Sequence, residues 1–355
     1  MHISKRDTIS LSKAWSIRAI AILLALMVDG IIIYANLNRH PLMDYVSLAS
    51  GAFGTSKRMW FTIRDCMILT CIAIGLAPAF KMRFWNIGAE GQVLMGGCVS
   101  AAIMIYGADH FGTAQLIPMM VVGSIVAGMI WGLIPAVFKA YFNTNETLFT
   151  LMLNYVAMQF VTFAIVFWEN PSGSNTVGII NAAGQKGWFP SIFGNMYGLN
   201  VIVVLIITLG MYVYMKYSKQ GYEIAVVGES QNTARYAGIN VKKVIIRTMM
   251  LSGAICGIAG CLIVSGASHT ISTSTAGGRG FTAIIVAWMS KFNPFAMILV
   301  SAFLVFMQQG SIQVASQFGL NENASDIITG ILLFFLIGCE FFINYKLEFR
   351  KKGEK

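Results

Sequence analysis

The sequence predicts an all-α, polytopic transmembrane helical bundle, and three observations support this. Hydrophobic residues make up 56% of the 355 residues and charged residues only 11%, whereas soluble domains carry about 25% charged residues. The mean hydropathy is +0.69. Apolar runs recur along the whole chain at close to the roughly 20 residues that a helix needs to cross a bilayer. We therefore expect a single transmembrane domain over residues 1–355 rather than a soluble domain with an anchor.

About ten stretches with little or no charge are candidate spans. They cover Trp15–Asn36, Phe61–Phe80, Gly88–Gly107, Ala114–Tyr141, Glu146–Trp168, Leu199–Tyr217, Ile246–Gly266, Gly280–Lys291, Phe295–Gln309 and Ala324–Tyr345. The eighth and ninth are short, so we expect half-helices or one broken hairpin there. The basic start of the chain is followed by no small-residue cleavage site, which indicates a retained first span rather than a signal peptide.

The distribution of Lys and Arg orients these spans, because cytoplasmic loops are enriched in both residues. With the N-terminus inside, most of the 25 cationic residues are cytoplasmic, and those left outside are Arg39, Lys57, Arg58, Arg64, Lys186 and Arg279. We expect a multi-pass protein of the cell membrane, in contact with lipid, with both termini cytoplasmic. Residues 38–60 and 170–198 are then external loops, and 216–247 is the longest cytoplasmic segment. The net charge of +10 reflects this bias rather than binding to nucleic acid.

The Cys and His residues predict no metal site, no cofactor and no catalytic group. The six cysteines lie in or beside apolar runs without a C-x-x-C pair, and the four histidines are scattered. Neither an H-E-x-x-H nor a G-x-S-x-G motif occurs, which argues against an intramembrane enzyme. The cysteines are expected to pack as small buried hydrophobic residues.

A polar segment, Asn86–Gln92, opens the third span. It combines Asn86, Glu90 and Gln92 with two glycines. A carboxylate at membrane depth is costly and usually faces the protein interior or a water-filled path. The segment is expected to line a pathway or a helix junction; the alternative is that Glu90 sits at the interface near Arg83 and only packs.

A second polar segment surrounds the start of the fifth span. Asn145 is suited to cap this helix, and Glu146 is favourable near the positive helix N-terminus. Asn154 lies two turns further in, where an amide must find a partner or a wet cavity. It is therefore a candidate for either a pathway residue or an interhelical hydrogen bond.

A third segment, Ala225–Asn240, is predicted to be cytoplasmic and is too polar to span. Ser230 is an N-cap candidate and Gly238 a stop signal, so a short helix is expected between them. Such a helix on the inner surface could be a docking lever for a soluble partner, or an ordinary connector.

Glycines mark two further places in the second half of the chain. Gly277–Thr282 precedes Ala283–Lys291 and follows no strand, so a nucleotide-binding loop is not expected. We expect instead a non-helical break at membrane depth. Gly253, Gly257 and Gly260 form a small-residue stripe for helix packing. Asn86–Gln92 and Gly277–Thr282 take matching positions in spans two to five and seven to ten, which hints at two inverted four-helix blocks.

Taken together and in this order, four segments resemble the permease subunits of bacterial ABC importers for nucleosides and simple sugars, within the branched-chain amino acid and ribose permease group. The segments are Asn86–Gln92, Asn145–Asn154, Ala234–Asn240 and Gly280–Pro294. The resemblance covers about Met43 to Ile337 and departs from the family pattern at Leu148, Phe149 and 286–290, where Trp288 could reshape the path.

The resemblance implies a type II ABC importer-like fold and a set of partners. These are a second permease in a homo- or heterodimer, a cytoplasmic ABC ATPase, and an extracytoplasmic substrate-binding protein. The solute would be small, neutral and polar: a nucleoside first, or a simple sugar such as ribose or galactose. The chain has no G-x-x-x-x-G-K-[ST] motif, so ATP hydrolysis would belong to the partner.

The resemblance and the segments together nominate two groups of residues. Coupling to the ATPase is assigned to Gly228, Glu229, Ala234, Arg235, Tyr236, Ala237, Gly238, Ile239 and Asn240. The substrate pathway is assigned to Asn86, Glu90, Gln92, Asn145, Glu146, Asn154, Gly280, Phe281 and Thr282. A competing hypothesis is an ion-coupled secondary transporter, which needs buried carboxylates; its candidates are Asp29, Asp65, Glu90, Asp326 and Glu340.

Overall fold

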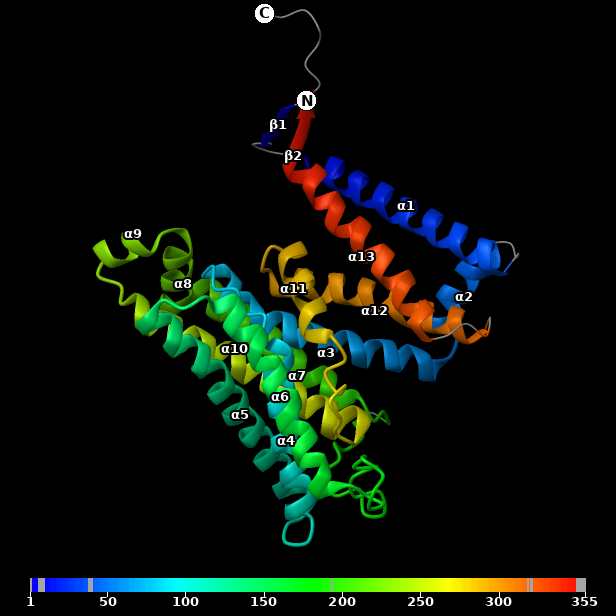
Figure 1. Cartoon of the computed structure of the whole chain (residues 1–355), viewed down its shortest axis with the longest axis vertical. Helices are drawn as coiled ribbons and strands as arrows, with labels where there is room; N and C mark the ends of the chain where they lie inside the picture. The colour runs from blue at the N-terminus through cyan, green and yellow to red at the C-terminus, as the bar shows by residue number, and fades with distance from the viewer. Residues whose placement is uncertain are drawn as a thin grey trace, which may run out of the picture. The chain divides into compact units, whose positions relative to one another are not determined.

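The computed structural model describes residues 2–5, 10–37, 41–192, 194–317, 319 and 322–348. These residues form thirteen α-helices, one π-helical turn and one two-stranded sheet (Figure 1). The all-α bundle that the sequence predicts is confirmed. The chain divides into two compact units, Met1–Thr62 with Phe303–Lys355, and Ile63–Ala302. Helices α3 (Ser56–Lys81) and α12 (Pro294–Gln317) contribute to both units.

The first unit joins the two ends of the chain. Its elements are β1 (His2–Lys5), α1 (Leu11–Leu37), α2 (Pro41–Phe53), α13 (Glu322–Asn344) and β2 (Tyr345–Glu348), with parts of α3 and α12. Strands β1 and β2 pair antiparallel. Arg18 of α1 forms an ion pair with Glu340 of α13 at 2.6 Å, so a candidate for ion coupling is already neutralised.

The second unit holds most of the predicted spans and the candidate site. It contains α4 (Ala89–Gly107), α5 (Thr113–Phe142), α6 (Glu146–Trp168), α7 (Gly198–Tyr217), α8 (Lys219–Glu229), α9 (Gln231–Tyr236), α10 (Val241–Ile263), the π-helical turn η1 (Val264–Ser268) and α11 (Arg279–Met289). Helix α10 packs against α5 and α4 (Figure 1).

The glycine stripe of α10 explains this close packing. A methyl group added to Gly253 would collide with the carbonyl oxygen of Gly128 on α5. One added to Gly257 would collide with the carbonyl oxygen of Ser124, and Gly260 meets the backbone of α4 in the same way. Small residues let helix backbones approach within van der Waals distance where lipid supplies no hydrophobic drive. The predicted packing role of these glycines is confirmed.

Eight helices among the described residues are long and apolar enough to cross a membrane. They are Ser56–Lys81, Ala89–Gly107, Thr113–Phe142, Glu146–Trp168, Gly198–Tyr217, Val241–Ser268, Pro294–Gln317 and Asp326–Ile343. Helix α11, at 11 residues, is the half-length helix expected for the eighth span. Helix α1 covers the first predicted span but is not one of the eight, so the count of ten stays a prediction.

The ninth span is longer than predicted. It was expected to end at Gln309, yet α12 has 24 residues and continues to Gln317. The polar residue beyond the predicted end is accommodated inside the first unit: the Ser311 hydroxyl donates to the Gln308 carbonyl at 2.9 Å and lies 3.1 Å from the Thr329 hydroxyl. Gly310 lies against Leu48 of α2.

The two predicted external segments differ in structure. In 38–60, α2 and the start of α3 are helical, while residues 38–40 lie outside the described residues. In 170–198 the described backbone is mostly irregular, as expected for a loop. This loop is attached to the end of α10, because Ile180 N donates to the His269 carbonyl at 2.8 Å and Phe189 N donates to the Ser265 carbonyl at 3.1 Å.

Candidate functional site

The segment before α4 is held from inside the protein. Asn86 is fully buried. Its Nδ2 donates to Ser252 Oγ of α10 at 3.1 Å, and its Oδ1 accepts from Gly88 N at 3.1 Å. The buried Gln92 amide lies within 3.4 Å of the Asn86 amide. The non-helical start of α4 is therefore tied to α10 through side-chain amides.

Asn154 ties the same segment to α6. Its Oδ1 accepts from Gly91 N at 2.8 Å, and its Nδ2 donates to the Ile87 carbonyl at 2.9 Å. One turn earlier, Thr150 Oγ1 accepts from Ile87 N at 3.2 Å. Of the two roles considered for Asn154, the interhelical hydrogen bond is present, and each end of its amide is satisfied.

Glu90 holds the start of α11. Its side chain is buried, and its Oε1 accepts from Gly278 N at 2.7 Å while its Oε2 accepts from Gly280 N at 2.8 Å. The first N–H groups of a helix have no intrahelical partner, and an anion is stabilised there. A methyl group added to Gly280 would lie 2.6 Å from the backbone nitrogen of Glu90, so only glycine allows this approach.

The chain between α10 and α11 runs back along α4. Ile271 lies beside Gly97 of α4, and Gly280 lies beside Glu90 at the start of that helix. The Gly-rich segment therefore descends beside α4 before α11 begins. Charge counting placed Arg279 and the start of α4 on opposite sides of the membrane, whereas Glu90 at the start of α4 accepts hydrogen bonds from both neighbours of Arg279.

The charge on Arg279 is balanced by contacts within the protein. Arg279 Nη2 lies 3.5 Å from Asp65 Oδ1, and Arg64 Nε lies 3.0 Å from the same oxygen. A cation paired with a carboxylate can be buried where an unpaired cation would not. We call Asn86–Gln92, Asn154 and Gly278–Gly280 together the polar junction.

Four predicted pathway residues are not part of the polar junction. Asn145 Oδ1 accepts from Thr147 N at 3.1 Å, which confirms its capping role, and Glu146 pairs with Lys139 at 2.8 Å. Both stand at the turn between α5 and α6. Thr282 Oγ1 donates to the Gly278 carbonyl at 3.3 Å, whereas the neighbouring Phe281 ring is 43% exposed.

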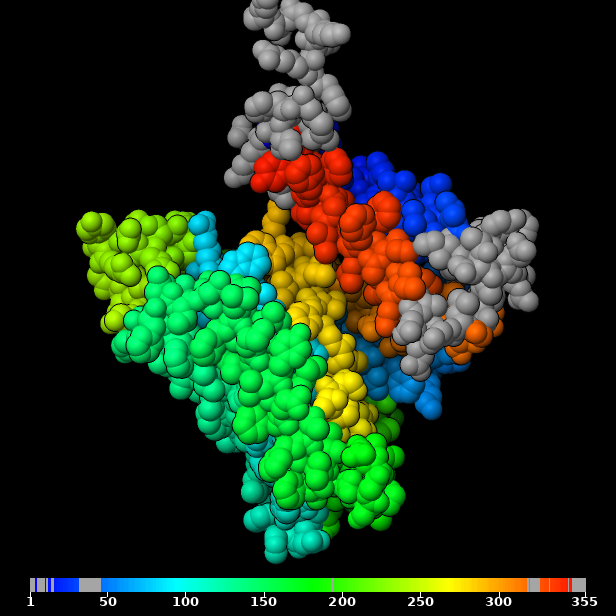
Figure 2. All heavy atoms as spheres, viewed as in Figure 1, coloured from blue at the N-terminus to red at the C-terminus, as the bar shows by residue number. Residues whose placement is uncertain are grey.

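The short helix predicted between Ser230 and Gly238 is present, and a second helix precedes it. We call α8 and α9 the α8–α9 lever. Ser230 Oγ accepts from Thr233 N at 3.2 Å, and Gly238 has φ +76°, which glycine adopts without strain, after the end of α9. Ala234 is fully buried and Tyr236 is 94% exposed. Figure 2 shows the yellow-green atoms of the lever at the surface, on the visible face of this unit.

The remaining coupling candidates surround this helix. Arg235, Ala237, Gly238 and Asn240 are exposed, and Ile239 is half-buried. Asn240 also caps α10, because its Oδ1 accepts from Lys243 N at 3.1 Å. Glu229 ends α8. The candidates therefore divide into an exposed set and a set that fixes the ends of helices.

The lever is attached to two long helices. A methyl group added to Gly228 would collide with the carbonyl oxygen of Lys81 at the end of α3. Glu223 of α8 pairs with Arg247 of α10 at 3.0 Å. Helix α8 is therefore in direct contact with α3 and α10.

Comparison with known proteins decides the class. Residues 59–337 match the family model described as a branched-chain amino acid transport system permease component. The chain belongs to this permease family. It is a transport component and not an enzyme, and it is a multi-pass membrane protein. Every predicted coupling and pathway residue falls inside the matched stretch.

Three relatives match almost the whole permease. It is 28% identical to the guanosine ABC transporter permease protein NupP of Bacillus subtilis, over 94% of this chain and 96% of that protein. It is 26% identical to the nucleoside ABC transporter permease protein NupB of Lactococcus lactis, over 95% and 96%. It is also 26% identical to the glucose ABC transporter permease protein TsgB13 of Haloferax volcanii, over 99% and 95%.

The sequence reasoning missed several residues of this permease. Thr150 could have been found, because it precedes Asn154 by four residues and shares its helix face. Ser252 directly precedes the glycine stripe of α10, and a lone hydroxyl there gave no signal. The pairing of Asp65 with Arg279 joins α3 to α11 across a large sequence separation, and no local pattern predicts such a contact.

Proposed function

We propose that this permease carries nucleosides across the cell membrane as a subunit of an ATP-binding cassette importer. The choice of nucleosides as substrate rests on one observation. The chain is similar, over 94% and 95% of its length, to two permeases named for guanosine and for nucleosides. The charges of the site support a neutral solute, because Glu90 is satisfied by backbone N–H groups and Asp65 is paired with Arg64 and Arg279.

The exposed face of α11 is suited to an aromatic solute. Phe281 and Trp288 are both partly exposed and lie seven residues apart, on one side of the helix. Trp85, before α4, stacks on Trp288 with ring centroids 5.6 Å apart and planes at 25°. Aromatic side chains bind bases by stacking, with about 1–3 kcal/mol per base. We therefore extend the pathway assignment to this aromatic face.

The α8–α9 lever would connect transport to ATP hydrolysis on a partner chain. Its exposed residues, Tyr236 first among them, would dock on the cytoplasmic ATPase. Closure of the ATPase would push α8, and the contacts of Gly228 with Lys81 and of Glu223 with Arg247 would move α3 and α10. A second permease would complete the path and an extracytoplasmic protein would deliver the solute. The whole chain would form one permease domain, with both termini in the cytoplasm.

A simple sugar is the second candidate solute, because the glucose permease relative matches 99% of this chain. An ion-coupled transporter has less support. Two of its candidate carboxylates, Asp65 and Glu340, are in ion pairs, and Asp326 is exposed. Asp29 is buried and accepts no hydrogen bond within the described part of the chain.

Uptake of radiolabelled guanosine in cells that carry the intact importer tests the proposal. We expect excess unlabelled nucleosides to abolish uptake and excess ribose, galactose or glucose to leave it unchanged. Competition by a sugar instead would replace the substrate with the second candidate. Uptake that continues after inactivation of the ATPase would contradict the importer mechanism itself.

A further inference from the structure

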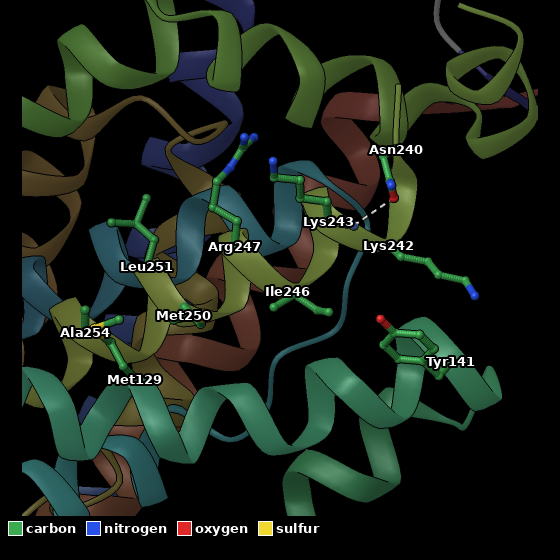
Figure 3. Close-up of a pocket in the computed structure, with 10 residues that line it drawn as sticks. All are labelled: Met129, Tyr141, Asn240, Lys242, Lys243, Ile246, Arg247, Met250, Leu251 and Ala254. Atoms are coloured by element: carbon green, nitrogen blue, oxygen red, sulfur yellow. Dashed lines mark hydrogen bonds between the residues drawn. The ribbon is translucent and has the colours of Figure 1, made fainter. Parts of the chain in front are cut away.

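A groove runs between α5 and the start of α10, apart from the polar junction. It has a volume of about 540 Å³. Its lining includes Lys242, Lys243 and Arg247 and the apolar side chains of Met129, Met250 and Ala254. Figure 3 shows the cationic residues on the first turns of α10, with Lys242 directed toward Tyr141 and Lys243 and Arg247 directed away from α5. Met250 and Ala254 lie further along α10, toward Met129 of α5. Polarity therefore changes along the groove from one end to the other.

The cationic end of the groove carries uncompensated charge. Arg247 is paired with Glu223 at 3.0 Å. Lys242 and Lys243 are exposed and form no ion pair with any residue in the described ranges. The Lys242 ammonium lies over the ring of Tyr141, 4.6 Å from its centroid, a contact that leaves its charge in place.

The apolar end of the groove lies between two long apolar helices. Val122, Val126 and Ile130 of α5, within two turns of Met129, are exposed. Helices α5 and α10 are both among the eight helices suited to cross a membrane. An occupant of the groove would thus meet two lysines at its head and hydrocarbon along its length.

We propose that this groove binds an anionic phospholipid, with its head group at the end of the groove that Lys242 and Lys243 line and an acyl chain along Met129, Met250 and Ala254. The charge complementarity and the direction of the polarity favour a lipid over a second protein chain. Basic pockets between transmembrane helices on the cytoplasmic side bind anionic head groups, and each cation near the surface contributes about 1 kcal/mol. The site is separate from the pathway, and lipid binding can be measured without transport.

The test uses the purified full chain in a neutral detergent, with thermal stability and native mass spectrometry as readouts. Phosphatidylglycerol is compared with phosphatidylcholine of the same acyl chains. We expect phosphatidylglycerol to be preferred. The preference should fall by about 25-fold in Lys242→Gln/Lys243→Gln, because about 1 kcal/mol per lysine corresponds to roughly fivefold in affinity.

A matched variant and a soluble anion make the test specific. Lys216→Gln/Lys291→Gln removes the same charge from two exposed positions outside the groove and should keep the preference. Equal loss in that variant would contradict a defined site. Glycerol 3-phosphate should bind far more weakly than the lipid; an equal effect would assign the groove to a free anion. Absence of any lipid preference, with dissociation of a dimer in Lys242→Gln/Lys243→Gln, would assign it to a second copy of the chain.

Discussion

The polar junction and the α8–α9 lever are built from the same residue types, used in opposite ways. In the junction, Asn86, Glu90 and Asn154 are buried, and each is satisfied by the backbone or by a side chain of another element. In the lever, Ser230 caps α9, Glu223 pairs with Arg247 of α10, and Tyr236 projects from the surface. The junction joins helices within the protein, whereas the lever carries the exposed surface that we propose docks on the ATPase.

This contrast bears on how polar residues in a membrane span are interpreted. A buried amide or carboxylate in such a span is commonly taken as a contact to the solute. Here Asn154 and Glu90 hold an irregular backbone at two helix starts, where unpaired N–H groups would be costly. We therefore expect mutations in the junction to affect stability first, and mutations in the lever to affect coupling alone.

The largest expected effect comes from removing the carboxylate of the junction. Glu90→Ala leaves the N–H groups of Gly278 and Gly280 unpaired, and hydrogen bonds to charged groups contribute about 1.5–3 kcal/mol each. We expect a loss of about 3 kcal/mol in the free energy of unfolding, measured as thermal stability in detergent. Glu90→Gln keeps the shape and one acceptor, so it should lose less. Unchanged stability in Glu90→Ala would contradict the structural role of Glu90 and leave it as a candidate pathway residue only.

The second effect compares two asparagines of α6. Asn154→Ala removes hydrogen bonds to Gly91 and Ile87 inside the protein and should cost about 2 kcal/mol, because buried partners are left unsatisfied. Asn145→Ala removes only an exposed helix cap, typically about 1 kcal/mol. The same unfolding assay ranks them. A larger loss at Asn145 would argue that the junction is not the more tightly built region.

The third effect should appear only in coupling. Tyr236→Ala removes an exposed ring and should leave thermal stability within about 0.5 kcal/mol. Solute-stimulated ATP hydrolysis by the assembled importer should fall by at least about tenfold, as expected of an aromatic interface residue. Ala234→Arg is the contrasting variant: its buried position means that it should unfold the lever and lower stability. Normal stimulation in Tyr236→Ala would show that the ATPase docks elsewhere.

The smallest effect concerns the loop 170–198. His269 is buried and stacked on Trp188 of this loop at 3.7 Å, and burial lowers the pKa of its imidazole below the ordinary value of 6.5. The unfolded chain takes up this proton near pH 6.5 while the folded chain resists it, so stability is full above that pH and declines as the pH falls. His269→Gln should flatten this decline between pH 7.5 and 5.5, whereas His110→Gln, at an exposed position, should not.

Much of the fold follows from the sequence because its signals are local. Apolar runs locate the spans, Ser230 and Gly238 bound α9, and glycines at 253, 257 and 260 predict close packing. The end of α12 was placed too early, since contacts within the first unit accommodate the polar Ser311 and the helix continues to Gln317.

The candidate site was only partly accessible to such reasoning. Polar residues at Asn86, Glu90 and Asn154 were recognised, but their partners are backbone groups of distant segments that carry no side-chain signal. The return of the chain beside α4 was missed for the same reason. Counting charges could not reveal that Arg279 is paired with Asp65.

The most direct test of the account is a cross-link between the lever and the ATPase. In membranes that contain the assembled importer, Tyr236→Cys is compared with Met196→Cys, an exposed position in the loop 170–198. With a short bifunctional thiol–amine reagent, we predict a permease–ATPase product for Tyr236→Cys that nucleotide-driven closure changes in yield, and none for Met196→Cys. A product from Met196→Cys without one from Tyr236→Cys would contradict both the docking site and the orientation of the permease.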